Sequence, residues 1–149
     1  MKYDYLKYWK IVKYYYQRKY NLSTSELDLI LFLYSEKYFT RKTLELFDNI
    51  LSWDKNRIKK MMDEGWILIF RESKPGSPRI YELSYKSRNL VTNIYKNLEC
   101  SETIPTHPTI NKMFRKGARF TDKTHRMVLL EMNKQIKEKK FKNIDGLDL

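Results

Sequence analysis

The segment 66–83 constrains the fold most, because there the apolar pattern changes from helical to extended. Residues 66–70 and 80–83 are two short runs rich in residues that favour β-strands. Residues 71–79 between them are polar and contain two prolines and a glycine, which favour a turn. The sequence therefore predicts one β-hairpin over 67–83, with a long basic tip.

Elsewhere the apolar side chains recur every three or four residues, as is typical of helices. Only four glycines and four prolines are present, so few long loops are expected. We predict a mainly α fold with a small β-hairpin. Helices are expected over 3–20, from a Ser23 cap to about Tyr38, from a Thr40 cap to about Phe47, over 53–64 and 85–98, and from a Thr121 or Asp122 cap to about Phe141.

Two of these helices have apolar stripes that predict which side faces the core. In the first helix the expected stripe is Tyr5, Tyr8, Val12 and Tyr16, widened by Leu6 and Trp9. In the last helix the apolar side is expected to carry Met127, Leu130 and Ile136.

Three regions are predicted along the chain. Residues 1–98 are expected to form one domain that includes the N-terminal helix. Residues 99–111 are expected to be a linker, because Pro105 and Pro108 prevent a continuous helix. Residues 112–149 are expected to form a basic C-terminal helical arm.

The charge favours polyanionic partners. The chain has 30 basic and 18 acidic residues and a formal net charge of +12, which suits DNA, RNA or an anionic surface. The alternative is an AT-rich genome, which would enrich lysine without any function. No stretch resembles a signal peptide or a membrane-spanning helix, and the single cysteine fits a reducing compartment. We therefore expect a cytoplasmic protein, or one carried inside a viral particle, with no membrane partner.

Motifs of catalysis are missing from the sequence. The two histidines and one cysteine have no zinc spacing, and no phosphate-binding loop, dinucleotide loop or serine-nucleophile motif is present. We expect no catalytic residues, no cofactor and no metal, and hence no enzyme.

Three helices followed by a hairpin is the order of a winged helix–turn–helix, in which the helix before the hairpin enters the major groove. The stretch Ile58–Ile67, ending in Asp-Glu-Gly-Trp-Ile, resembles the exit from the recognition helix in MarR-type winged-helix regulators. The stretch Leu83–Arg88 is similar to that family's entry into the helix after the wing. The resemblance covers about residues 5–98.

The resemblance implies DNA binding as a two-fold dimer, formed by the terminal helices. Aromatic side chains of the first helix suit such an interface, although they could equally cover the domain's own core. The residues expected at the dimer interface are Tyr5, Trp9, Tyr16 and Tyr20.

Nucleic-acid contacts are expected from the 53–64 helix in the major groove, from the hairpin as wing, and from the start of the third helix. Asn56 and Arg57 are the candidate base readers, since lysines more often neutralise phosphates. The full set is Arg41, Lys42, Lys55, Asn56, Arg57, Lys59, Lys60, Arg71, Lys74 and Arg79. For each of them the alternative is a solvated charged face.

The C-terminal arm interleaves basic residues with Phe114 and Phe120. Such a pattern suits an arm that follows a nucleic-acid backbone, a surface for an acidic protein, or a helix packed on its own domain. The basic residues concerned are Lys112, Arg115, Lys116, Arg119, Lys123 and Arg126.

The favoured function is a DNA-binding transcriptional regulator. The first alternative is a winged helix that binds nucleic acid in replication or packaging. The second is a winged-helix scaffold that serves as a structural or assembly protein, viral in origin, without sequence-specific DNA binding.

Overall fold

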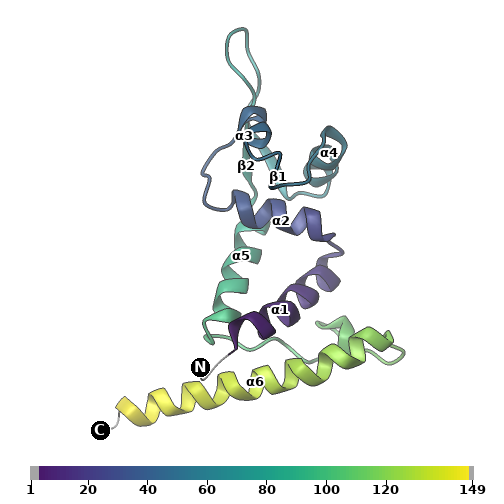
Figure 1. Ribbon diagram of the computed structural model, residues 1–149, viewed down its shortest axis with the longest axis vertical. Coiled ribbons are helices and arrows are strands. Elements are labelled where there is room, and N and C mark those ends of the chain that lie inside the picture. The colour runs from purple at the N-terminus through teal and green to yellow at the C-terminus, as the bar shows by residue number, and fades with distance from the viewer. Residues whose placement is uncertain (1–3, 148–149) are drawn as a thin grey trace. The chain divides into compact units, whose positions relative to one another are not determined.

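The computed structural model describes the backbone of residues 4–147 and the side chains of residues 4–140 (Figure 1). The prediction of a mainly helical chain with one small antiparallel hairpin is confirmed. The elements are α1 (Tyr5–Tyr20), α2 (Thr24–Leu33), α3 (Arg41–Leu46), α4 (Lys55–Asp63), β1 (Ile67–Arg71), β2 (Ile80–Leu83), α5 (Tyr85–Leu98), the 3-10 helix η1 (Lys112–Phe114) and α6 (Phe120–Leu147).

The chain divides into two compact units. Unit 1 contains residues 1–21 and 93–149, and unit 2 contains residues 22–92. This division differs from the predicted regions 1–98, 99–111 and 112–149, because α1 groups with the C-terminal part of the chain and the boundary falls within α5.

In unit 2, α2 begins after its Ser23 cap as predicted, whereas α4 begins at Lys55 and not at the predicted residue 53. The Ser23 hydroxyl accepts a hydrogen bond from the Glu26 N–H at 3.1 Å, and the Asp54 carboxylate accepts one from the Arg57 N–H at 2.7 Å. These caps satisfy backbone donors that the first turn leaves without a partner. The core lies between α2, α3, α4 and the hairpin base, and its buried side chains are Leu27, Leu29, Ile30, Leu33, Phe39, Leu44, Ile58, Met61, Trp66, Ile67 and Leu83.

The predicted end of the second helix near Tyr38 is wrong, since α2 ends at Leu33. Phe39 lies instead in an antiparallel bridge with Tyr81, each residue's N–H donating to the other's carbonyl at 3.0 and 2.8 Å. Phe39 is buried, so its backbone groups need partners, and β2 supplies them. The long-range pair ties the segment before α3 to β2.

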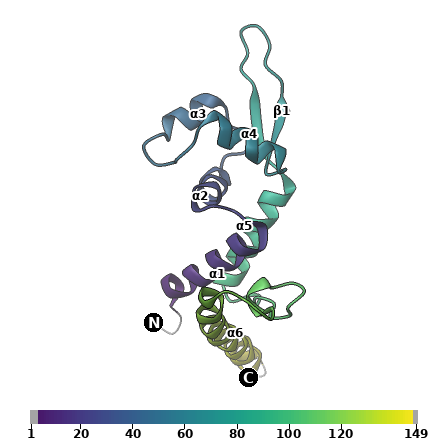
Figure 2. The ribbon, with the colours of Figure 1, turned by 90° about the vertical axis from the view of Figure 1, so that its right-hand side faces the viewer.

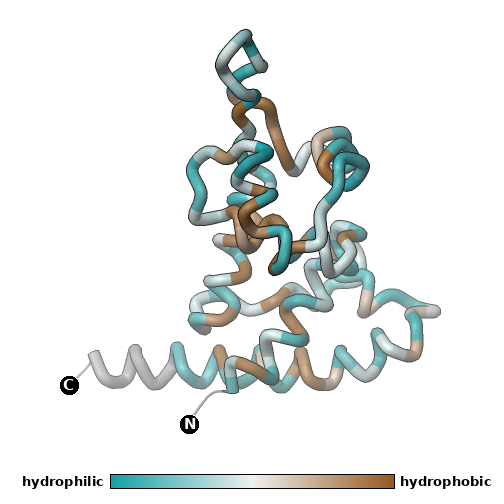
Figure 3. Tube along the Cα trace, turned by 45° about the horizontal axis from the view of Figure 1, so that its top comes forward, coloured by the Kyte–Doolittle hydropathy of each residue, from teal (hydrophilic) through white to brown (hydrophobic). Residues whose placement is uncertain are grey.

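The hairpin pairs β1 with β2 in the register Ile67↔Leu83, with an irregularity between Ile69 and Arg71. Its loop is closed by a bridge between Lys74 and Ser77, with Gly76 at a φ of +76°. Figures 1 and 2 both show the loop projecting beyond the helices of unit 2, and Figure 3 shows that its tip is hydrophilic while β1 is apolar. The segment 72–79 between the strands is thus hydrophilic, but the prediction of a long tip is wrong, because Lys74 and Ser77 pair and close a two-residue turn of Pro75 and Gly76.

In unit 1, α6 packs against α1 and η1. The α1 stripe is only partly as predicted: Tyr8, Val12 and Tyr16 are buried, but Tyr5 and Leu6 are exposed, and Ile11 and Tyr15 take their place. Asn21 ends α1 in the left-handed conformation at a φ of 54°.

The predicted apolar side of α6 is wrong for two of its three members. Met127 and Leu130 are exposed, while Leu129, Met132 and Ile136 form the buried face. That face also carries the buried polar residues Asp122 and Asn133, which apolar spacing alone assigns to the surface. Thr121 and Asp122 do not cap the helix, because α6 starts at Phe120 and Asp122 lies in its first turn.

Residues 99–111 contain no regular secondary structure, as predicted, but they are packed within unit 1. The Asn133 side-chain amide donates to the Ile104 carbonyl at 2.9 Å and accepts from the Ile104 N–H at 3.0 Å. The Asn111 side chain donates to the Pro105 carbonyl at 2.9 Å. These bonds hold the segment against α6.

Candidate nucleic-acid interface

Helix α4 buries part of its apolar surface and leaves part of its polar surface accessible. Ile58 and Met61 are buried, while Lys55, Asn56 and Lys59 are exposed. The structure thus leaves these three predicted contact residues accessible, on a helix whose N-terminus is fixed by Asp54.

Arg57, one of the two candidate base readers, is engaged within unit 2. Its guanidinium donates to the Ser52 carbonyl at 2.6 Å and to the Ser52 hydroxyl at 2.8 Å. These bonds tie the start of α4 to the preceding loop. Among the described residues, Arg57 therefore has a structural partner that Asn56 lacks.

Lys60 is likewise held, by Glu26 on α2. Its ammonium lies 2.9 Å from the Glu26 carboxylate, whose side chain is buried. Burial acts to raise the pKa of the Glu26 carboxyl, but hydrogen bonds from Lys60 and Ser23 outweigh it and lower that pKa. The same hydrogen bond raises the pKa of Lys60. This ion pair holds α4 against α2. Helical spacing does not predict it, because 34 residues separate Lys60 from Glu26.

The predicted hairpin contacts have different surroundings. Arg79 forms an ion pair with Glu72, which raises the pKa of Arg79 and lowers that of Glu72. Arg71 donates to the Ser77 hydroxyl at 2.9 Å. Lys74 lies at the exposed tip.

The start of α3 presents two further predicted contacts. Arg41 pairs with Glu45 on the same helix at 3.1 Å, and both side chains are largely exposed. Lys42 is exposed beside it.

The cations of α3, α4 and the hairpin meet around one groove of about 350 Å³. Arg41, Lys55, Lys59 and Arg79 line it, over a floor of Leu44, Trp53, Ile58, Met62 and Tyr81. A neighbouring hollow of about 280 Å³ shares Arg41, Arg79 and Tyr81, and adds Lys42, Thr40, Ser73 and Pro78. The fold therefore brings together four predicted contact residues that come from three separate elements.

Trp53 lines the groove although it is not among the predicted contact residues. Its indole Nε1 is shielded from solvent and has no hydrogen-bond partner among the described residues. Tyr81 is the other aromatic residue of the floor, and its ring stacks on Phe39 at 5.6 Å. No sequence signal separates such groove residues from core residues, because both are apolar at the same helical or strand spacing.

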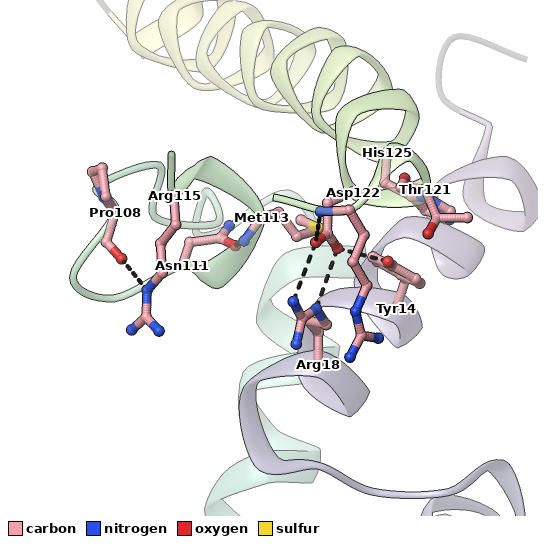
Figure 4. A network of polar contacts seen from close by, with 10 residues as sticks. Tyr14, Arg18, Pro108, Asn111, Met113, Arg115, Thr121, Asp122 and His125 are labelled. Carbon is pink, nitrogen blue, oxygen red and sulfur yellow. Dashed lines mark hydrogen bonds and ion pairs between the residues drawn. The ribbon is translucent and has the colours of Figure 1, made fainter. Parts of the chain in front are cut away.

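A buried carboxylate, Asp122, lies in the same segment of unit 1 as the predicted contacts of the C-terminal arm. Asp122 is buried and accepts hydrogen bonds from the Tyr14 hydroxyl at 2.6 Å, from the Arg18 guanidinium at 3.3 Å and from the Arg119 N–H at 3.1 Å (Figure 4). Burial acts to raise the pKa of Asp122, but these bonds outweigh it and hold that pKa below its usual range. This network joins α1 to the start of α6.

Three of the predicted arm contacts are engaged or partly covered, and three are open. Lys112 is half-buried, Arg115 donates to the Pro108 carbonyl at 3.0 Å, and Arg126 lies over the Phe114 ring at 5.9 Å. Lys116, Arg119 and Lys123 are exposed, and so is Arg115 despite its bond to Pro108.

The four residues of α1 predicted at a dimer interface differ in their exposure to solvent. Tyr16 is buried within unit 1, where its hydroxyl donates to the Asn97 side-chain carbonyl at 2.6 Å, and burial raises its pKa. It is therefore unsuited to a surface contact. Tyr5 is exposed, and Trp9 and Tyr20 are partly exposed.

The two units differ sharply in charge. Of the chain's 30 basic and 18 acidic residues, unit 1 holds 18 and 8, which leaves 12 and 10 for unit 2. The charge excess of the sequence thus belongs mainly to unit 1, although the predicted groove-binding helix and hairpin belong to unit 2.

Within residues 4–140, whose side chains are described, no cluster of histidine, cysteine, aspartate and glutamate is arranged to hold a metal ion. No helix in the same part of the chain has both the length and the hydrophobicity to cross a membrane. Comparisons with protein-family models, with curated proteins and with solved structures found no match.

Proposed function

We propose that unit 2 is a winged helix–turn–helix that binds double-stranded DNA, with α4 in the major groove and the β1–β2 hairpin as the wing. The observation that carries the proposal is the groove that Arg41, Lys55, Lys59 and Arg79 share. Cations from a helix and a hairpin on one surface can contact the phosphates on both sides of a groove together.

The element order supports the same proposal. A helix, a bridge at Phe39, two helices and a hairpin follow one another in unit 2. The exposed residues of α4 are Lys55, Asn56, Lys59, Lys60 and Asp63, and Lys60 is paired with Glu26. Base contacts are therefore assigned to Asn56, and phosphate contacts to Lys55 and Lys59. Arg57 contacts a base only if DNA binding breaks its hydrogen bonds to Ser52.

The test is a binding titration of a random duplex at two salt concentrations. The double variant Lys55→Gln/Lys59→Gln removes two exposed charges without touching the core. We expect it to weaken binding roughly tenfold at low salt and to reduce the slope of log affinity against log salt by about 2.

Lys37→Gln is the matched control, because Lys37 is an exposed lysine of the same unit that does not line the groove. If the control variant weakens binding as much as the double variant, or if the double variant binds like the wild type, the groove is not the DNA site.

The regulatory role rests on the resemblance to MarR-type regulators and includes a homodimer. Tyr5, Trp9 and Tyr20 are the proposed contacts on α1, and Tyr16 is no longer among them. Sedimentation at micromolar concentration tests the dimer, and preference for one duplex over random competitor tests the regulator.

A second function, a scaffold in a structural or viral assembly, is favoured by the charge balance of unit 2. Its 12 basic residues face 10 acidic ones, and Arg41, Lys60 and Arg79 are already in ion pairs. Such a unit attracts a polyanion weakly. Failure of the protein to bind any duplex at low salt would favour the scaffold.

A further inference from the structure

Phe120, the first residue of α6, is a large apolar side chain in an unusual position. Its side chain is 83% exposed, although burying a phenyl ring would stabilise the fold by about 2 kcal/mol or more. Single exposed apolar residues are common, so exposure alone carries no conclusion. The basic residues near Phe120 in the sequence make its exposure informative.

The sequence around Phe120 is cationic without compensation. Lys116, Arg119 and Lys123 flank it and are all exposed. Asp122 is the only acidic residue in the segment 112–126. That carboxylate is buried and bound by the Tyr14 hydroxyl, the Arg18 guanidinium and the Arg119 N–H, so its charge is already matched by Arg18 (Figure 4).

Exposed cations around an accessible aromatic ring are the elements with which proteins bind single-stranded nucleic acid. The cations neutralise the backbone, and the ring stacks on a base. A duplex offers its phosphates but keeps the faces of its bases stacked inside, so it uses the cations and not the ring. The ring therefore favours a strand with unpaired bases.

We propose that Phe120, with Lys116, Arg119 and Lys123, forms a binding site for a single-stranded polynucleotide in unit 1. An unpaired base stacks on the phenyl ring, and the three cations contact the adjacent phosphates. The site is separate from the groove of unit 2 and does not depend on the function proposed for that unit.

The experiment measures the anisotropy of a labelled oligo(dT) of about 15 nucleotides, beside a duplex of equal length. Phe120→Ala should weaken oligo(dT) binding about tenfold and leave duplex binding nearly unchanged. Met127→Ala is the matched control, because Met127 is 74% exposed on the same helix and outside the cation cluster. It should bind both probes like the wild type.

The charge component is tested by the triple variant Lys116→Gln/Arg119→Gln/Lys123→Gln. It should weaken oligo(dT) binding more than Phe120→Ala does, and lower the salt slope by about 2. The triple variant Lys134→Gln/Lys137→Gln/Lys139→Gln removes equal charge from exposed positions further along α6 and should have a smaller effect.

Two results would overturn the proposal. The first is an oligo(dT) affinity of Phe120→Ala equal to that of the wild type, or a loss of equal size for the duplex. The second is an oligo(dT) affinity that falls in Lys55→Gln/Lys59→Gln as far as in the unit 1 triple variant, which would place strand binding on α4. Loss of duplex binding alone in the α4 variant supports two separate sites.

Discussion

Unit 1 and unit 2 stabilise a buried carboxylate in similar ways but use their remaining charges differently. Asp122 in unit 1 and Glu26 in unit 2 are both buried, and each is bound by one basic side chain, Arg18 and Lys60 respectively. In unit 1 many cations are left over, whereas in unit 2 basic and acidic residues nearly balance. The net charge of the whole chain therefore does not show which unit holds the excess of cations.

The largest effect should come from Asp122→Ala, because Asp122 accepts bonds from two side chains and one backbone N–H. Its removal leaves the Arg18 guanidinium only partly solvated. We expect a loss of about 3 kcal/mol of unfolding free energy. Hydrogen exchange by segment should show the loss in α1 and α6. Asp28→Ala, at an exposed position of α2, is the control.

The equivalent change in unit 2, Glu26→Ala, should cost less. Lys60 is about half exposed and regains water when its partner is lost. We expect a loss of about 2 kcal/mol, measured by denaturant unfolding. Hydrogen exchange should increase in α2 and α4 rather than in α6. If Glu26→Ala lowers the unfolding free energy as much as Asp122→Ala or more, the exposure of the basic partner does not determine the loss.

Acid should weaken both units through these carboxylates. Each has a folded-state pKa below its unfolded value, which is about 4. Their stabilisation is present above the unfolded pKa and is lost as the pH falls through the folded pKa. Unfolding free energy should therefore decline from about pH 5 downward. Asp122→Asn should flatten this decline, and an unchanged pH slope would exclude Asp122 as its source.

The smallest effect should come from Tyr16→Phe. The change removes the hydroxyl that donates to Asn97 but keeps the ring in the core of unit 1. Asn97 retains its bond to the Glu102 carbonyl. We expect a loss of about 1 kcal/mol by thermal or denaturant unfolding. The oligomeric state should not change, since Tyr16 is no surface contact. If Tyr16→Phe sediments differently from the wild type, Tyr16 takes part in an interface between copies of the chain.

Most helices and the hairpin were predictable, because caps, apolar spacing and turn residues act over a few positions. Ser23 acts at the start of its own helix, and the sequence placed it there. The bridge of Phe39 with Tyr81 was missed, because its partner lies far along the chain. Helical spacing predicted that Lys55 and Lys59 on α4 are exposed. It did not predict the hydrogen bonds of Arg57 with Ser52 or the ion pair of Lys60 with Glu26.

The sequence by itself determined the order of the elements, their caps and the total charge, all of which depend on local spacing or simple composition. The tertiary structure alone decided which charges remain free. Arg18 and Asp122 are 104 residues apart, and Lys60 and Glu26 are 34 apart. It also turned Met127 and Leu130 outward, since the buried polar residues Asp122 and Asn133 fix the inward face of α6. The physical reason is that a charge or a polar side chain acquires its role from its partners in space, which no short stretch of sequence contains.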